Sequence, residues 1–355
     1  MSNITKSSLA DLNVIVPEHH RESANKYFSD IFNLLPANTQ RSYKSDLKQY
    51  YDFCFANDMP GLTPDIDLTE TSIKAYVMAM CESQLAHNTI VHRMATLSKF
   101  MAVAKFPNPL KQSEYLRDFI KLQMKAHDIY ARANQAPALR LRDLEEINNN
   151  VIPDTLLDIR DLAMINMMFD GLLRADEVAP VQLKHIYYKE NKILVPTSKT
   201  DQSGVGSLRP VSNTTLAYVS DYISEANIDR KTQQDKLKND PTRINKGILF
   251  RPLSPKGTTL LPYDESITRL ADMPKIAYVN IYKSLKRIAK KGGVYIPISG
   301  HSPRVGAAVT MAENNISIKE IQEAGDWKNP DMPARYTEQA QVESGMSKMF
   351  DIFKR

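Results

Sequence analysis

A short stretch near residue 300 brings together side chains that are suited to phosphate chemistry. His301 and Arg304 stand three residues apart at the start of an expected helix, which puts an imidazole and a guanidinium on one face. A guanidinium donates bidentate, charge-assisted hydrogen bonds that fit phosphate oxygens. Trp327 and Tyr336 follow, nine residues apart, and a tyrosine hydroxyl beside such a site would have a phosphorus atom to attack. These residues indicate covalent phosphoryl transfer on a nucleic-acid backbone.

Two more basic residues join this set earlier in the chain. Arg174 follows an apolar helix pattern, and Lys199 lies in an expected hairpin. Each candidate alone has an ordinary structural explanation: an arginine near a helix end is favoured by the macrodipole, and a hairpin lysine usually faces solvent. A single tryptophan, such as Trp327, is more often a core residue. The order of the whole set favours the catalytic interpretation.

The elements that must position these residues are mainly helical. Apolar residues at three- and four-residue spacing predict helices at 22–35, 39–56, 69–84, 88–103, 114–130, 141–149, 156–172, 176–182 and about 274–290. Strand signals occur only at 192–197 and 206–211, which predicts one β-hairpin. The expected fold is therefore mainly α, with a small antiparallel sheet in the second half.

Composition narrows the class of protein without deciding it. The 46 Lys and Arg against 41 Asp and Glu give a net charge of +5, which permits a nucleic-acid partner. Cys54 and Cys81 lack metal-ligand spacing, so we expect small buried hydrophobes in a reducing cytoplasm. Residues 1–17 lack the apolar core of a secretory signal, and runs such as Met164–Phe169 are too short to span a bilayer. The sequence predicts a cytoplasmic protein.

Several longer motifs carry a family resemblance. They are Ser299-Gly300-His301-Ser302-Pro303-Arg304-Val305-Gly306-Ala307-Ala308, the Trp–Tyr pair, Gln135-Ala136-Pro137-Ala138 and Leu85-Ala86-His87-Asn88-Thr89-Ile90. Together they resemble the tyrosine site-specific recombinases of the lambda-integrase superfamily, and within these the Cre type most closely. The resemblance covers about residues 22–353.

The resemblance implies a catalytic role for seven residues. They are Arg174 as the first arginine, Glu177 as its accompanying acid, Lys199 as the hairpin lysine, His301 and Arg304 as the paired histidine and second arginine, Trp327 where many relatives have histidine, and Tyr336 as the nucleophile. Glu177 would orient His301 or Lys199, and the Trp327 indole would donate to the phosphate.

The implied reaction needs neither a metal nor another cofactor. Arg174 and Arg304 would hold the equatorial oxygens on which charge accumulates. Tyr336 would attack to form a 3′-phosphotyrosyl link and free a 5′-hydroxyl, with Lys199 protonating the leaving oxygen and His301 acting as general base. Another strand's 5′-hydroxyl could then reverse the step.

Two positions depart from the family pattern. Pro303 stands where a small non-proline residue is usual, and it could occupy the first helical turn. Asp326 stands before the tryptophan, where glycine is familiar, and nothing in the sequence explains a carboxylate near a phosphate site.

The resemblance also implies a domain plan and an assembly. We expect a flexible arm at 1–20, a helical, SAM-like core-binding domain at 21–130, a linker at 131–138 and a catalytic domain at 139–355. An apolar helix at about 345–355 would dock into a neighbouring subunit. The two domains would form a C-shaped clamp around double-stranded DNA. A homotetramer on two inverted-repeat sites would recombine them through a Holliday junction. We expect no accessory proteins to be required and no membrane association. The source would be bacterial, phage or plasmid DNA, with the protein associated with the nucleoid.

The DNA-reading residues are expected on three helices. They are Arg41, Ser42, Asn88, His92 and Arg93 in the first domain, and Lys275, Tyr278, Asn280, Lys283 and Arg287 in the second, the last two facing phosphate.

Three alternatives remain open from the sequence. One is a phage- or transposon-type integrase that needs accessory proteins, and another is a relaxing topoisomerase that acts as a monomer. The third is a DNA-binding regulator with a silent active site. A suicide oligonucleotide separates the regulator from the enzymes, because only an enzyme stays covalently attached to it.

Overall fold

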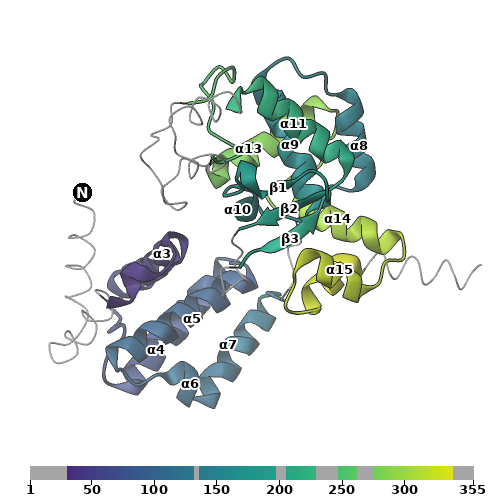
Figure 1. Cartoon of the computed structure of the whole chain (residues 1–355). Coiled ribbons are helices and arrows are strands. Elements are labelled where there is room, and N and C mark those ends of the chain that lie inside the picture. The colour runs from purple at the N-terminus through teal and green to yellow at the C-terminus, as the bar shows by residue number, and fades with distance from the viewer. Residues whose placement is uncertain (1–29, 132–135, 197–204, 229–246, 262–275, 339–355) are drawn as a thin grey trace, which may run out of the picture. The chain divides into compact units, whose positions relative to one another are not determined.

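The chain is divided into two compact units, which meet in the sequence between Asn134 and Gln135 (Figure 1). The computed structural model describes residues 30–131, 136–196, 205–228, 247–261 and 276–338. Each unit has its own apolar core. The expected arm at 1–20, half of the expected linker at 131–138 and the expected helix at 345–355 lie outside the described residues, so the proposed domain limits stay predictions.

The first unit is helical throughout its described part. A 3-10 turn, η1 (Phe32–Leu34), precedes the helices α3 (Ala37–Ala56), α4 (Ile66–Glu82), α5 (His87–Ala104), α6 (Pro109–Gln112) and α7 (Glu114–Ala126). The Asp65 side chain accepts hydrogen bonds from the first backbone amides of α4, which starts that helix earlier than the sequence pattern predicted. Cys54 and Cys81 are buried and free, which confirms their predicted core positions.

The second unit combines helices with one small sheet. Its elements are α8 (Leu141–Asn150), α9 (Leu156–Asp170), α10 (Ala175–Val178), η2 (Leu183–His185), β1 (Ile186–Tyr187), β2 (Lys192–Val195), β3 (Ser207–Pro210), α11 (Asn213–Glu225), α13 (Tyr278–Lys291), α14 (Ser302–Glu313) and α15 (Ile318–Gly325). A further helical segment covers residues 331–338.

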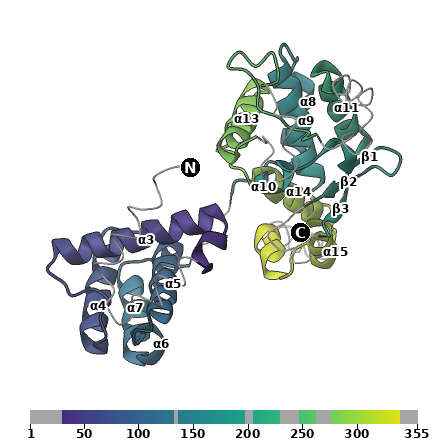
Figure 2. The ribbon, with the colours of Figure 1, turned by 60° about the vertical axis from the view of Figure 1, so that its left-hand side comes forward.

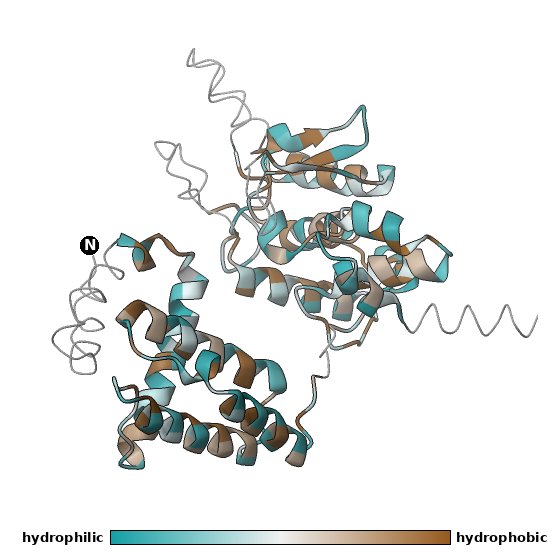
Figure 3. Ribbon diagram, turned by 90° about the horizontal axis from the view of Figure 1, so that it is seen from below, coloured by the Kyte–Doolittle hydropathy of each residue, from teal (hydrophilic) through white to brown (hydrophobic). Residues whose placement is uncertain are grey.

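Helix α9 forms the centre of this unit and packs against α11, α13 and α14 (Figure 2). Every residue from Leu162 to Phe169 is buried. A helix that is apolar around its circumference must be covered on all sides, which explains the surrounding layer of helices. Hydrophilic and hydrophobic residues alternate along the helices of both units, as is usual for helices with one buried face (Figure 3).

The sheet has three antiparallel strands in the order β1-β2-β3. Ile193 of β2 lies opposite Ile186 on one side and Arg209 on the other. The predicted two-stranded hairpin was therefore one strand short, because β1 has only two residues and too little alternation to be seen in the sequence. The expected hairpin tip, at 197–204, lies outside the described residues.

The first residues of the second unit run directly along α14. A Cβ atom at Gly306 would come within 1.6 Å of the Leu139 carbonyl oxygen, so only glycine permits this approach. The Leu139 amide donates to the Ser302 carbonyl oxygen at 3.1 Å, and Arg140 pairs with Glu313 at 3.1 Å. The segment is fixed at both ends of α14.

In the described part of the chain, no helix is long and apolar enough to cross a membrane.

Candidate active site

Arg174 and Glu177 lie at the short connection between α9 and α10. Arg174 is the residue before α10, and its backbone amide donates to the Glu177 carboxylate at 2.8 Å. This contact satisfies an amide at the helix start and fixes the turn. The Arg174 guanidinium also donates to Glu177. The Glu177 side chain is only 2% exposed but that of Arg174 is 19% exposed, so the arginine can still reach a ligand.

Arg304 projects from the first turns of α14 and is fully buried. Its terminal nitrogens donate to the carbonyl oxygens of Leu172 and Gly325, and Nη1 lies 3.6 Å from Glu177 Oε2. The buried Nε has no hydrogen-bond partner among the described residues. Burial and the nearby Arg174 lower the pKa of the Arg304 guanidinium, although Glu177 opposes the shift. The arginine is therefore held firmly while its positive charge stays under-compensated.

Trp327 connects this arginine to the tyrosine. The Arg304 Cζ atom lies 4.0 Å from the centroid of the Trp327 ring, a cation–π arrangement. The Trp327 and Tyr336 ring centroids are 6.0 Å apart. A Cβ atom at Gly325 would lie 1.8 Å from the indole ring, so glycine is required to seat the tryptophan. Tyr336 is half-buried in the helical segment 331–338.

His301 occupies the position before the first residue of α14, and its side chain is exposed. Its backbone amide donates to the Ser299 hydroxyl at 3.2 Å, which shapes the turn into the helix. Pro303 lies in the first turn of α14, where its missing amide costs no hydrogen bond, as predicted.

Asp326 follows α15 with a left-handed backbone, at φ 53°. This conformation explains why glycine would suit the position, because a side chain is strained there. The Asp326 carboxylate lies 3.4 Å from a terminal nitrogen of Arg209, a residue that sequence reasoning did not identify. Arg209 is 3% exposed and donates to the carbonyl oxygens of Ala324 and Gly325. The one available signal was an arginine that alternates with the buried Val211 at the end of a strand.

The structure thus joins five of the seven expected residues in one connected group. They are Arg174, Glu177, Arg304, Trp327 and Tyr336. His301 lies three residues before Arg304 at the start of the same helix. Lys199 lies outside the described residues. Glu177 was expected to orient His301 or Lys199, whereas its ion pairs in the described structure are with the two arginines.

The expected DNA-reading residues of the first unit lie on α3 and α5. Arg41 and Asn88 are exposed and Ser42 is half-exposed. His92 Nδ1 lies 2.7 Å from an Asp46 oxygen on α3. Arg93 donates to the Tyr76 hydroxyl at 3.1 Å and to the Gln49 side chain. The last two residues therefore tie helices together, and base contact by them stays a prediction.

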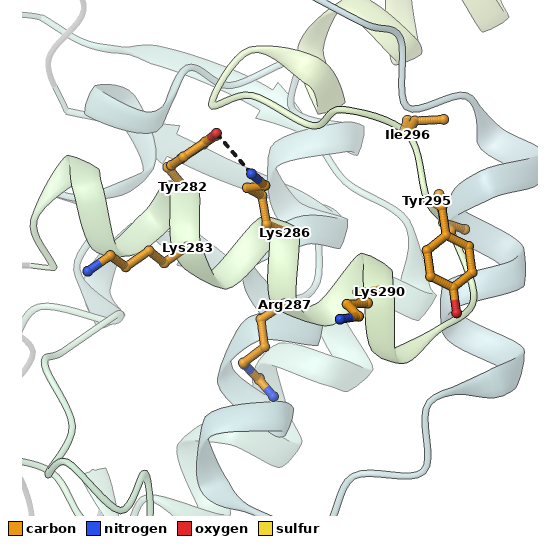
Figure 4. Close-up of a pocket in the computed structure, with 8 residues that line it drawn as sticks. Tyr282, Lys283, Lys286, Arg287, Lys290, Tyr295 and Ile296 are labelled. Atoms are coloured by element: carbon orange, nitrogen blue, oxygen red, sulfur yellow. Dashed lines mark hydrogen bonds between the residues drawn. The ribbon is translucent and has the colours of Figure 1, made fainter.

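In the second unit, α13 carries a basic surface. An open hollow of about 490 Å³ is lined by Tyr282, Lys283, Lys286, Arg287, Lys290, Val294, Tyr295 and Ile296 (Figure 4). Lys283 is exposed, as are Tyr278 and Asn280 at the start of the helix. Lys275 lies outside the described residues.

Arg287 differs from its neighbours on α13. Its side chain points away from those of Lys283 and Lys286 (Figure 4). It pairs with Asp158 and, at 2.8 Å, with Asp161, both on α9. It also donates to the Leu157 carbonyl oxygen at 3.2 Å. Its expected phosphate contact stays a prediction, and the same side chain now has a clear structural role.

The group of arginines and tyrosine can stabilise negative charge and supply an oxygen nucleophile. Within the described residues there is no group of three or more His, Cys, Asp or Glu that could hold a metal ion.

Comparisons with known proteins agree with this chemistry. The sequence profile of the Phage integrase family matches residues 137–343. The recombinase Cre of Escherichia phage P1 is 25% identical over 282 residues, which cover 77% of each chain. The Tn1549 transposon integrase in complex with circular intermediate DNA superimposes with a TM-score of 0.55 at 16% identity, covering 93% of this chain and 98% of that chain. The lambda integrase tetramer bound to a Holliday junction gives 0.55 at 14% identity, covering 92% and 80%. These two structures support the mainly helical fold.

Proposed function

This chain belongs to the phage integrase family, the tyrosine recombinases, and we propose that it cleaves and rejoins DNA through a covalent link to Tyr336. The family assignment makes it an enzyme of site-specific DNA recombination. One observation carries the assignment of the nucleophile. The buried Arg304 guanidinium stacks on Trp327, whose ring in turn packs against Tyr336. An anion held by the arginine is therefore close to the tyrosine.

The arginines supply charge stabilisation. During displacement the phosphorus is bonded to five oxygens, and negative charge accumulates on those that neither attack nor leave. Arg174 and Arg304 donate to these oxygens, while Glu177 keeps the two guanidinium groups at fixed positions. Because the positive charge of this group is only partly compensated, a phosphate replaces the missing counter-charge.

Two proton transfers complete the step. The Tyr336 oxygen attacks phosphorus, its proton passes to His301, and the bond from phosphorus to the 5′-oxygen breaks. Lys199 protonates that leaving oxygen. The 3′-phosphotyrosyl link is then attacked by the 5′-hydroxyl of another strand, which releases the tyrosine without a nucleotide cofactor. Chelators leave the rate unchanged in this scheme.

At the level of assembly, we propose a homotetramer on two inverted-repeat sites. Each subunit would clamp the duplex between its domains, with the segment 345–355 docked into a neighbour. The lambda integrase tetramer on a Holliday junction supports this arrangement by analogy. The similarity to a recombinase of an Escherichia phage supports action on DNA in the bacterial cytoplasm.

The target sequence has to be found by experiment. Selection from a randomised inverted-repeat library yields a site for this protein, and a nicked suicide duplex of that site then traps the covalent complex. Wild-type protein should form an adduct that resists denaturation, and peptide mapping should place it on Tyr336.

The decisive variant is Tyr336→Phe, which keeps the ring and its contact with Trp327 but removes the attacking oxygen. It should bind the duplex with unchanged affinity and form no adduct. Tyr187→Phe, in β1, is the matched control and should cleave normally. An adduct mapped to another residue, or one formed by the Phe variant, would overturn the assignment.

A further inference from the structure

Arg209 brings a third buried guanidinium to the active site. It lies on β3 and is 3% exposed, yet its terminal nitrogens reach the last two carbonyl groups of α15, those of Ala324 and Gly325. Carbonyl groups at the end of a helix have no partner within that helix, and they carry the negative end of its dipole. A buried cation is therefore a fitting partner for them.

One of these carbonyl groups is shared with the catalytic group. The Gly325 oxygen accepts from Arg304 Nη2 at 2.7 Å and from Arg209 Nη2 at 3.3 Å. Trp327, which carries the stacking contact to Arg304, is only two residues further on. A shift of the Gly325 carbonyl would therefore move the acceptor that holds Arg304 Nη2 and also the Trp327 ring that stacks on the Arg304 guanidinium.

Asp326 supplies the charge that makes this arrangement tolerable. Without it, Arg209 would be a third positive charge near Arg174 and Arg304, opposed only by Glu177. The Asp326 carboxylate lies 3.4 Å from Arg209, and its side chain is 42% exposed. It holds this place despite a left-handed backbone that disfavours a side chain.

We propose that Arg209 and Asp326 act as one positioning pair for strand cleavage. Arg209 fixes the Gly325 carbonyl that anchors Arg304, and Asp326 cancels the charge that Arg209 brings. Removal of either residue alone should therefore impair cleavage or folding, because the other residue is left with an unpaired charge. Asp326 alone is an unpaired carboxylate that repels the scissile phosphate, and Arg209 alone is an uncompensated buried cation.

This proposal rests on the proposed function, and a double-mutant cycle tests it. The four proteins are the wild type, Arg209→Gln, Asp326→Gly and the double variant, each assayed on the selected suicide duplex. The measurements are the single-turnover rate of adduct formation per folded molecule and the affinity for the duplex. Glycine at 326 also relieves the backbone, so Arg209→Gln combined with Asn315→Gly serves as the control. Asn315 also has a left-handed backbone, at φ 61°, just after α14.

Arg209→Gln should slow cleavage by about a hundredfold, the loss typical of one preorganised group, with a smaller change in affinity. The double variant should regain at least about tenfold of that rate, because the repelling carboxylate has gone. The Asn315 control should regain none. A merely structural Arg209 predicts no rescue by Asp326→Gly, so equal rates for the double variant and Arg209→Gln overturn the proposal.

Urea unfolding of the same four proteins without DNA provides a second readout. Asp326→Gly should raise the unfolding midpoint in the Arg209→Gln background, because glycine relieves the left-handed backbone at this position. The rise should be smaller in the wild type, because there the same substitution also removes the ion pair with Arg209. Equal shifts in the two backgrounds would refute the pair even if the wild type formed no adduct. A wild type without adduct would refute the proposed function instead.

Discussion

Two clusters in the second unit both combine buried arginines with carboxylates, but they differ in how far the positive charge is neutralised. The α9–α13 cluster consists of Arg160, Arg287 and Lys291 with Asp154, Asp158 and Asp161. The site cluster consists of Arg174, Arg209 and Arg304 with Glu177 and Asp326. Among the described residues, the first cluster pairs three cations with three carboxylates, whereas the second pairs three with two.

The pKa shifts follow this difference. Burial would lower the pKa of Arg287, but Asp161 and Asp158 raise it above its usual value. Burial lowers the pKa of Arg304, and Arg174 lowers it further. The α9–α13 cluster is complete in itself and holds helices together. Among the described residues the site cluster has one positive charge more than its carboxylates neutralise, which is the charge that the proposed phosphate would neutralise. An ion cluster that lacks one negative charge is thus the better indicator of a phosphate site.

The largest expected effect comes from removing a carboxylate of the α9–α13 cluster. Asp161 is fully buried and accepts hydrogen bonds from both Arg160 and Arg287. Asp161→Ala leaves two cations without this partner and should reduce the free energy of unfolding by about 3–5 kcal/mol. Urea denaturation measures the loss. Cleavage per folded molecule should be unchanged, and a selective loss of cleavage would break the distinction between the clusters.

The corresponding change in the site cluster is Arg304→Ala. It removes a preorganised donor, which should cost about 3–4 kcal/mol of transition-state stabilisation, or roughly a hundred- to a thousandfold in cleavage rate. Single-turnover adduct formation on the suicide duplex measures this. Arg174 still pairs with Glu177, so the fold should survive. A variant that unfolds yet cleaves normally when folded would place Arg304 in the same class as Arg287.

The pH dependence of folding stability should distinguish the α9–α13 cluster from the buried His185. Burial would raise the pKa of Asp158, but Lys291 and Arg287 hold it well below its usual range. The contribution of Asp158 to stability therefore persists until the pH falls below about 4.

Burial, with a smaller effect of Lys184, lowers the pKa of His185 to about 4. Because the folded pKa is the lower one, stability is present above pH 6.5 and is lost toward pH 4. We expect a loss of about 2 kcal/mol between about pH 7 and 4.5.

Urea midpoints across this pH range measure that loss. His185→Gln should flatten the profile, because the amide does not titrate in this window. A profile that stays equally steep in the variant would assign the acid sensitivity to a carboxylate instead.

The smallest effect concerns salt. Lys283→Met should reduce the slope of log affinity against log salt by about one unit, because one phosphate contact is lost. Arg287→Met should change the slope less, since its charge is already neutralised by Asp158 and Asp161, and should lower stability instead. Duplex binding between about 50 and 200 mM salt measures both slopes. Equal slopes would return Arg287 to the phosphate contacts.

The sequence predicted those features that depend on local residue spacing and on the order of motifs along the chain. Helices such as α9 follow from apolar spacing, and the arginine, tryptophan and tyrosine positions follow from motif order. The partners of these residues could not be predicted in the same way. Arg287 meets Asp161 across 126 positions, and Glu177 on α10 forms an ion pair with Arg304 on α14, which is similarly distant in the sequence. A basic helix face in the sequence does not distinguish a cation that faces solvent from one that pairs across the core.

The place of Arg209 also depended on contacts distant in the sequence. One arginine in a four-residue strand carries no signal of the helix end that it meets 115 positions later. Asp326 was conspicuous in the sequence, but its explanation required both the left-handed backbone and the neighbouring strand.

The close approach of Leu139 to Gly306 has a mechanical consequence. With no space for a side chain between them, the stretch of backbone that leads into the second unit cannot slide along α14 or lift from it without breaking the Leu139–Ser302 hydrogen bond. The backbone at Leu139 is therefore coupled to the amino end of the helix that bears Arg304, and a displacement of this backbone would also displace the first turns of α14.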